Sequence, residues 1–280
     1  MRSDWNRPEV YDTPGDGERR IRLSVSYDGS EYHGWQSQGD YASVQSVISG
    51  CVSKVVGKDT VVYGSGRTDS GVHALDQGCH FDTSSSIDPE RFAVILNTLL
   101  PKSIRVRSSS LAPEGFHARY STMSREYWYL IKESGSMLPF DRKRVAPYRA
   151  LPPISLLSEY AGFLFGTHDF TTFASARDQS LSRVRDVYVS EWDTIADAYG
   201  EPLLRYRVAG NAFLYHQVRS MVGTMAEAAI AGESAESFKA RLDARDRDKA
   251  LRTAPPDGLY LASVSYDADK YQWFEEEYGR

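Results

Sequence analysis

The sequence is poor in cysteine, in long apolar runs and in net positive charge, and each shortage excludes a class of protein. Two of the 280 residues are cysteines, Cys51 and Cys79, too few for a disulfide framework or a zinc site with four thiolate ligands. No stretch approaches the roughly 18 consecutive apolar residues of a membrane-spanning helix. The polar N-terminus, interrupted by proline and glycine, does not resemble a signal peptide. We therefore expect a cytoplasmic protein with both thiols buried.

The charge of the chain is unevenly distributed. The net charge is −5, from 33 Lys and Arg against 38 Asp and Glu, which by itself argues against a nucleic-acid partner. Residues 101–150, however, hold ten basic and four acidic side chains, a local charge of +6, with aromatic residues interleaved. This segment favours an electropositive groove, while chance variation over a solvated surface explains the charge about equally well.

The apolar periodicity predicts two copies of one α+β unit. The predicted elements of the first half are a strand at 21–27, a helix at 44–55, strands at 60–64 and 72–82, a helix at 88–99 and a strand at 104–108. Those of the second half are a strand at 117–132, a helix at 154–165, strands at 184–192 and 203–209, helices at 212–231 and 235–249 and a strand at 258–266. The order β-α-β-β-α-β is ferredoxin-like. We predict two such domains, 21–112 and 113–267, between a flexible leader (1–20) and an acidic tail (268–280).

The glycine-rich segment 64–73, GSGRTDSGVH, holds the densest set of functional residue types. It begins like a dinucleotide-binding fingerprint, but Asp69 stands where the third glycine is needed for close helix packing, and the Lys-Ser/Thr pair of a phosphate-binding loop is missing. The segment instead predicts a tight loop that displays Arg67 and Asp69, with glycines that let a ligand approach the backbone. A surface turn with an ordinary ion pair is the alternative interpretation.

Metal and nucleophile chemistry have little support in the sequence. The six histidines show no HExxH motif or other pairing suited to one helical face. A G-x-S-x-G elbow and a reactive Cys–His setting are also missing. We therefore expect no metal and no cofactor, and the best-presented reactive group is the carboxylate of Asp69 beside an arginine.

The segment GSGRTDSGVHALDQ strongly resembles the signature loop of the TruA family of tRNA pseudouridine synthases, in which the aspartate of G-R-T-D is the essential catalytic residue. The resemblance extends over residues 21 to 266. Further blocks that resemble the family, in its order, are YDGSEYHGWQSQ (27–38), FHARYSTMSREYWYLI (116–131), GTHDFTTFAS (166–175), NAFLYHQVRSMVG (211–223) and PPDGLYL (255–261). The resemblance implies two ferredoxin-like halves, with antiparallel sheets, that flank a central catalytic cleft.

The resemblance also implies roles for individual residues. Asp69 corresponds to the catalytic aspartate, Tyr127 to the active-site tyrosine, and Arg219 to the arginine that pairs with the aspartate and helps displace the base. Leu259 corresponds to an apolar residue of the uracil pocket, and Arg67 is a further substrate-binding candidate. Without the resemblance, Tyr127 is an ordinary core residue of a strand, and Arg219 is a rim residue of an amphipathic helix.

Glu126 and Trp128 flank Tyr127 at positions where family members usually carry arginines. Ser70 stands where many members carry alanine. Both are departures from the family pattern, and the first removes cations that other members place beside the tyrosine.

The implied reaction is isomerisation of uridine to pseudouridine at tRNA positions 38–40, by a homodimer whose subunits share each tRNA. Asp69, kept ionised by Arg219, attacks the sugar or the base, or removes a sugar proton; the sequence leaves these routes open. Two alternatives are a synthase for another tRNA or RNA position and a non-catalytic RNA-binding protein on the same fold. A nucleoside hydrolase has less support, because no second carboxylate is evident to activate water.

Overall fold

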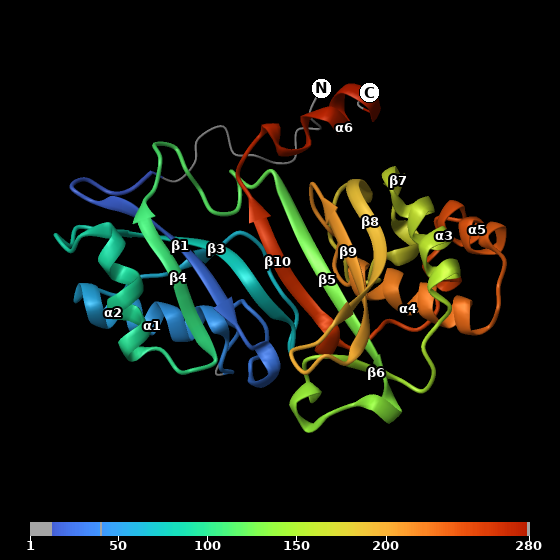
Figure 1. Cartoon of the computed structure of the whole chain (residues 1–280). Helices are drawn as coiled ribbons and strands as arrows, with labels where there is room; N and C mark the ends of the chain where they lie inside the picture. Colours follow the sequence, from blue (N-terminus) through green and yellow to red (C-terminus); the bar gives the residue numbers. More distant parts are fainter. Residues whose placement is uncertain (1–12, 40, 279–280) are drawn as a thin grey trace. The chain divides into compact units, whose positions relative to one another are not determined.

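The chain, described by a computed structural model over residues 13–39 and 41–278 (Figure 1), divides into two compact units. Unit 1 comprises Met1–Met123 and Leu261–Asp267, and unit 2 comprises Ser124–Tyr260 and Ala268–Arg280. Residues 1–12 of the predicted leader and the last two residues of the predicted tail lie outside the described residues. Within the described part of the chain, no helix has the length and apolar character needed to cross a membrane.

Unit 1 follows the predicted β-α-β-β-α-β order. Its elements are β1 (Arg19–Tyr27), α1 (Val44–Val56), β2 (Tyr63–Gly64), β3 (His73–Thr83), α2 (Phe92–Leu99) and β4 (Ile104–Leu111). The strand order is β4-β1-β3, with β2 paired to β3, and all these pairs are antiparallel. Helices α1 and α2 contact each other, as Figure 1 shows beside β1 and β4.

Helix α1 illustrates how the sequence determines these elements. Ser43 forms a capping box with Ser46 at its start, and Gly57 ends it in the left-handed conformation, with φ of 72°. The buried side chains Val44, Ile48 and Val52 recur at helical spacing and face the core. The apolar periodicity was therefore sufficient to predict this helix.

Unit 2 holds a four-stranded antiparallel arrangement covered by helices. Its elements are β5 (Ser124–Glu133), β6 (Ala146–Tyr148), α3 (Ile154–Leu164), β7 (Gly166–Asp169), β8 (Val184–Ala196), β9 (Pro202–Gly210), α4 (Gln217–Ile230), α5 (Ala235–Asp243) and α6 (Gln272–Tyr278). The strand order is β5-β9-β8-β7, and β6 pairs with β5 in parallel. Helix α3 contacts β8, α4 and α5. The remaining strand, β10 (Leu259–Ser265), contributes residues to both units.

The predicted α+β class is confirmed: the described residues form ten strands with mixed pairing, together with helices. Both cysteines are free and buried, as predicted. Burial raises the pKa of the Cys79 thiol well above its ordinary value, and the nearby Asp76 carboxylate adds to this.

Three predicted boundaries are wrong by five residues or more, and each error has a local cause. The strand predicted from residue 117 begins at Ser124, because residues 117–123 turn back on themselves, with the Ser121 N–H donating to the His117 carbonyl. The helix predicted from residue 212 begins at Gln217, because His216 has φ of 63°, which a right-handed helix does not allow. The helix predicted to residue 249 ends at Asp243, two residues before Arg245, whose φ is 50°.

Candidate active site

Asp69 and Arg67 lie on the glycine-rich loop between β2 and β3, as predicted. Asp69 is half-buried and Arg67 is exposed. The Val72 N–H donates to the Asp69 carbonyl over 3.1 Å, and Gly71, the third residue of this turn, has φ of 81°. A positive φ at that position is the requirement of a type II turn and explains the glycine. Asp69 therefore opens a tight turn rather than a surface loop of variable shape.

The backbone on both sides of Asp69 is tied to the segment that follows β1. The Trp35 N–H donates to the Thr68 carbonyl over 3.1 Å, and the Gly71 N–H donates to the Tyr32 carbonyl over 3.3 Å. The hydroxyls of Tyr27 and Thr68 are hydrogen-bonded at 2.8 Å. Because these bonds act immediately before and shortly after Asp69, its carboxylate projects from a fixed piece of backbone.

Two glycines of the 27–38 segment allow this close approach. A Cβ atom at Gly29 would lie 1.9 Å from the Val72 carbonyl oxygen, and one at Gly34 would lie 2.5 Å from that of Thr68. Gly34 also has φ of 81°, a conformation that side chains disfavour. The two sequence blocks 27–38 and 64–73 therefore interlock by backbone contact.

Tyr127 lies on β5 in unit 2 and is buried. Its ring meets Phe213 edge to face, with 5.2 Å between the ring centres and 87° between the planes. The neighbouring Glu126 accepts hydrogen bonds from Trp128 Nε1 at 2.8 Å and Arg207 Nε at 3.0 Å. Glu126 is thus an internal partner of Arg207 on β9 rather than an unexplained acidic residue.

Arg219 lies on α4, half-buried, and is bonded to the segment that precedes β10. Its Nε donates to the Ala254 carbonyl over 2.8 Å, and the Ala254 N–H donates back to the Arg219 carbonyl over 3.0 Å. The next residue, Pro255, accepts a 2.8 Å hydrogen bond from the Tyr129 hydroxyl. Burial raises the pKa of Tyr129 well above its ordinary value despite the opposing charge of Arg219, so the hydroxyl stays a donor.

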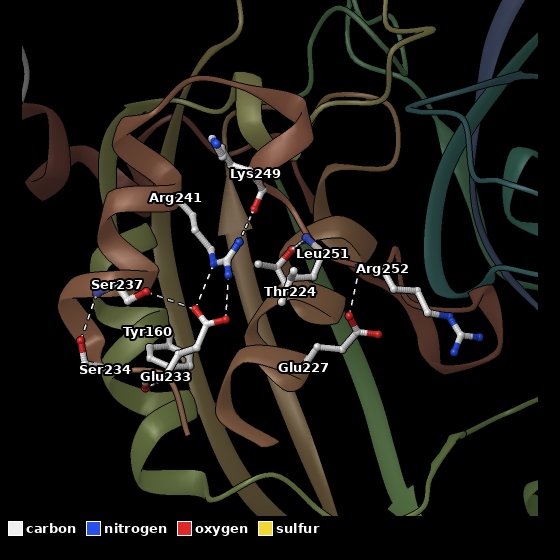
Figure 2. A network of polar contacts seen from close by, with 10 residues as sticks. All are labelled: Tyr160, Thr224, Glu227, Glu233, Ser234, Ser237, Arg241, Lys249, Leu251 and Arg252. Carbon is white, nitrogen blue, oxygen red and sulfur yellow. Dashed lines mark hydrogen bonds and ion pairs between the residues drawn. The ribbon is translucent and has the colours of Figure 1, made fainter. Parts of the chain in front are cut away.

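The segment 249–258, here called the strap, is fastened along α4 by groups that the sequence did not reveal (Figure 2). The Leu251 N–H donates to Thr224 Oγ1 over 3.1 Å, and the Arg252 N–H donates to Glu227 Oε2 over 3.2 Å. A Cβ atom at Gly223 would lie 1.9 Å from the Arg252 carbonyl oxygen. The strap therefore fixes the carbonyl that orients Arg219.

The start of the strap is held from α5. Arg241 forms a two-bond ion pair with Glu233, at 2.7 and 3.1 Å, and donates to the Lys249 carbonyl over 2.7 Å (Figure 2). The Arg241 side chain lowers the pKa of Glu233, which keeps the carboxylate charged. No motif in the sequence predicts this network, because its members are spread over α4, α5 and a loop.

Leu259, the first residue of β10, is buried, and its place in a uracil pocket stays a prediction. Gly258 before it packs on β5, where a Cβ atom would lie 2.5 Å from the Leu130 carbonyl oxygen. The strap thus brings Leu259 to the strand that carries Tyr127. The predicted residues fall into two groups, Arg67 and Asp69 in unit 1 and the other three in unit 2, and an ion pair between Asp69 and Arg219 stays a prediction.

Two further expectations concern metal and charge. Among residues 13–39 and 41–278, no group of three or more His, Cys, Asp or Glu side chains could hold a metal ion. Of the ten cations of segment 101–150, Lys132 is fully buried, and the half-buried Arg105 donates to the Pro101 and Ile104 carbonyls. The segment therefore offers fewer cations to an RNA than its composition suggested.

Comparison with known proteins supplies the chemical context for these residues. A family model described as tRNA pseudouridine synthase matches residues 23–121 and 161–267. A tRNA pseudouridine synthase A of Bacillus pumilus is 41% identical over 252 residues, which cover 89% of this chain and 99% of the relative. The corresponding proteins of Bacillus subtilis and Ruminiclostridium cellulolyticum are 39% and 38% identical, over 89% of this chain and 99% and 100% of their own. The resemblance inferred from the motifs is confirmed.

Proposed function

Because the chain belongs to the TruA family of tRNA pseudouridine synthases, which are isomerases, we propose that it converts uridine into pseudouridine in the anticodon stem-loop of tRNA, at positions 38–40. In this reaction the N1–C1′ bond of uridine breaks and a C5–C1′ bond forms. The proton leaves C5 and N1 gains one, so atoms and electrons balance without an oxidant, a reductant or a hydrolytic water. The reaction therefore needs no metal or organic cofactor.

Asp69 is the catalytic residue in this proposal. Its carboxylate attacks the sugar or the base, or removes a sugar proton, and each route needs a charged, precisely placed oxygen. The turn of Asp69, tied to Trp35 before it and to Tyr32 after it, supports this role because such a fixed carboxylate needs little reorganisation when the substrate arrives. This two-sided fastening is the observation that carries the proposal.

The other residues bind and hold the uridine. Tyr127 stacks on the uracil and Leu259 adds an apolar wall, both buried as such a pocket requires. Arg219 pairs with Asp69 and takes the space of the flipped base, and Arg67, exposed beside Asp69, binds the RNA backbone. Flipping the base out of the stem costs a few kcal/mol, which these contacts offset.

The architecture that serves this reaction is part of the same proposal. Two ferredoxin-like domains, residues 21–112 and 113–267, flank a central cleft, and two copies of the chain form a homodimer that shares each tRNA. The enzyme works in the cytoplasm, where its substrate is found.

Replacing Asp69 by asparagine tests the proposal. Asp69→Asn keeps the shape but removes the charge, so we expect turnover to fall more than tenfold, about 1.4 kcal/mol in barrier height, with tRNA binding preserved. Pseudouridine mapping on an unmodified tRNA transcript gives the turnover and the modified position. Asp76→Asn, a half-buried carboxylate on β3, is the matched control and should stay within twofold of wild type. Turnover above a tenth of wild type in Asp69→Asn would refute the assignment.

A further inference from the structure

One fully buried lysine joins two loops of unit 2 far apart in the sequence. Lys132 is 0% exposed, and its Nζ donates to Asp141 Oδ2 over 3.0 Å and to Asp197 Oδ2 over 2.8 Å. Asp141 belongs to the loop between β5 and β6, and Asp197 begins the turn between β8 and β9. Burial alone would lower the pKa of Lys132, but the two carboxylates raise it, so the lysine stays charged between them.

Each aspartate also shapes the backbone around it. Asp141 Oδ2 accepts the Leu138 N–H at 2.8 Å, and its carbonyl accepts the N–H groups of Arg144 and Val145 at 2.9 and 3.1 Å. Asp197 Oδ1 accepts the N–H groups of Tyr199 and Glu201 at 2.8 and 2.9 Å. The lysine therefore fastens two loops whose backbone is also held by hydrogen bonds to the same two aspartates.

The first loop presents three consecutive cations. Arg142, Lys143 and Arg144 are all exposed, directly after the buried Asp141. Lys143 has φ of 61°, a left-handed conformation that is uncommon for lysine and that the two N–H bonds to Asp141 impose on it. An asparagine or a glycine adopts such a conformation more readily than a lysine.

The two loops together present an exposed aromatic pair. Phe140 is 60% exposed and Tyr199 is 57% exposed, and their rings stack with 5.2 Å between centres and 28° between planes. Phe140 precedes Asp141, and Tyr199 follows Asp197 by two residues. The contacts of Lys132 with these two aspartates, here called the lysine clamp, therefore bring the rings together. Exposing the apolar faces of two stacked rings to water is unfavourable. Such a pair is expected where a flat ligand adds to the stack.

A hollow of about 440 Å³ lies beside the cations, lined by Met137, Leu138, Arg142, Lys143 and Val145, with Asp257 as its acidic residue. The loop that forms it is the green segment next to β6 in Figure 1. A lining that combines apolar side chains with two cations suits a ligand with a flat apolar face and a phosphate.

We propose that Phe140, Arg142, Lys143, Arg144 and Tyr199, here called the tip, form a second RNA-binding surface, separate from the uridine pocket. The cations bind backbone phosphates, and the aromatic pair stacks on an unpaired base of the same tRNA. Cations with exposed, stackable aromatic rings are the combination that binds single-stranded RNA. The proposal rests on the proposed function, because it assigns the tip to the same substrate.

A charge-removal experiment tests the phosphate contacts. In Arg142→Ala/Lys143→Ala/Arg144→Ala we expect tRNA affinity to fall at least tenfold at about 150 mM salt. The slope of log K against log salt should be shallower by about two to three, because each phosphate that a cation neutralises contributes roughly 0.9 to it. The control is Lys239→Ala/Arg245→Ala/Lys270→Ala, three exposed cations of the same unit that include another left-handed residue, Arg245. The control should stay within twofold of wild type.

A second variant separates stacking from charge. Phe140→Ala/Tyr199→Ala should weaken tRNA binding about tenfold while leaving the salt slope unchanged, because no cation is removed. KM should rise in both tip variants and kcat should stay within twofold. Wild-type affinity in both tip variants, with melting curves showing that they are folded, would overturn the proposal and leave the tip to a protein partner. Wild-type turnover on tRNA, measured alongside, reports separately on the proposed function.

Discussion

Two regions that carry proposed active-site residues are held in place by different means. The loop of Asp69 in unit 1 is fixed by backbone hydrogen bonds and by glycines that admit a neighbouring chain segment. The strap beside Arg219 in unit 2 is fixed largely by side chains, with Thr224 and Glu227 accepting its N–H groups and Arg241 holding its start. The first region should be most sensitive to changes of its glycines, and the second to single polar substitutions.

The largest effect that this comparison predicts is that of Gly34→Ala. The new Cβ atom would lie 2.5 Å from the Thr68 carbonyl oxygen, in a residue with φ of 81°. Overpacking and the left-handed conformation together should cost about 3 kcal/mol of unfolding free energy, with turnover lost as the Asp69 loop moves.

The control for Gly34→Ala is Gly57→Ala, which has a similar φ of 72° but nothing within 4 Å of the added atom. It should cost about 1 kcal/mol and leave turnover unchanged. Urea unfolding and turnover measured on both variants decide the point. Equal losses in the two variants would mean that φ alone, and not backbone contact, fixes the loop.

The next largest expected effect is the pH dependence of the free energy of unfolding, to which titratable groups of the two units should contribute in different pH ranges. His80 on β3 is buried, accepts the Ala118 N–H at Nδ1 over 3.1 Å, and its pKa falls from its ordinary 6.5 to about 3, chiefly through burial and then through Arg20 and His117. Between pH 6.5 and about pH 3 the His80 side chain binds more protons in the unfolded chain than in the folded one. The free energy of unfolding therefore falls as the pH drops through this range.

The expected loss from His80 is about 2 kcal/mol of unfolding free energy between pH 7.5 and pH 5. His80→Asn offers an oxygen in place of Nδ1 without titrating, so its free energy of unfolding should depend less steeply on pH over that range. In unit 2, hydrogen bonding from Lys132 lowers the pKa of Asp197, so this contact should weaken only in stronger acid. An unchanged slope in His80→Asn would contradict the prediction.

Arg219→Lys should reduce turnover by at least tenfold, about 1.4 kcal/mol, with little change in melting temperature. Lysine keeps the charge but has no Nε–H to donate to the Ala254 carbonyl and no planar fork for the proposed pair with Asp69. Arg219→Ala should be worse, because it removes the charge as well. Near-normal turnover at saturating tRNA in the folded Lys variant would return Arg219 to an ordinary place on the rim of α4.

The smallest expected effect is that of Glu227→Gln, which keeps an oxygen acceptor for the Arg252 N–H but removes its charge. The loss should be about 0.5 to 1 kcal/mol in unfolding free energy, since charged acceptors bind more strongly than neutral ones. Turnover should fall two- to threefold as the strap loosens. If Glu227→Gln instead matched Arg219→Lys in turnover, the strap would contribute more to catalysis than Arg219 itself.

The extent to which the sequence predicted the fold and the site differs between local and distant contacts. Residues 44–55 carry their own periodicity, and the loop at 64–73 carries its own turn glycines, so both were predictable without knowing what surrounds them. The start of α4 was missed because His216 is left-handed, directly after Tyr215, whose N–H donates to the distant Asp178 carboxylate. Local order could be inferred wherever neighbouring residues suffice to cause it.

The strap and the lysine clamp could not be foreseen for the opposite reason. Gly223 is needed only because Arg252 crosses above it, 29 positions along the chain. Lys132 was counted among the cations of a basic segment, and only its two aspartates, nine and 65 positions away, explain why it is buried. Such residues are interpretable once their partners are known, and composition alone assigned Lys132 to the wrong surface.

The burial of both native cysteines makes the protein suited to site-specific labelling. Cys79 is fully buried and Cys51 nearly so, and burial raises the pKa of each thiol. Neither offers a reactive thiolate to a maleimide dye, since the thiolate is the nucleophile. A single Lys143→Cys substitution in the otherwise native chain would therefore take up one fluorophore at the tip. The dye would report tRNA contact there in real time, without prior removal of any cysteine.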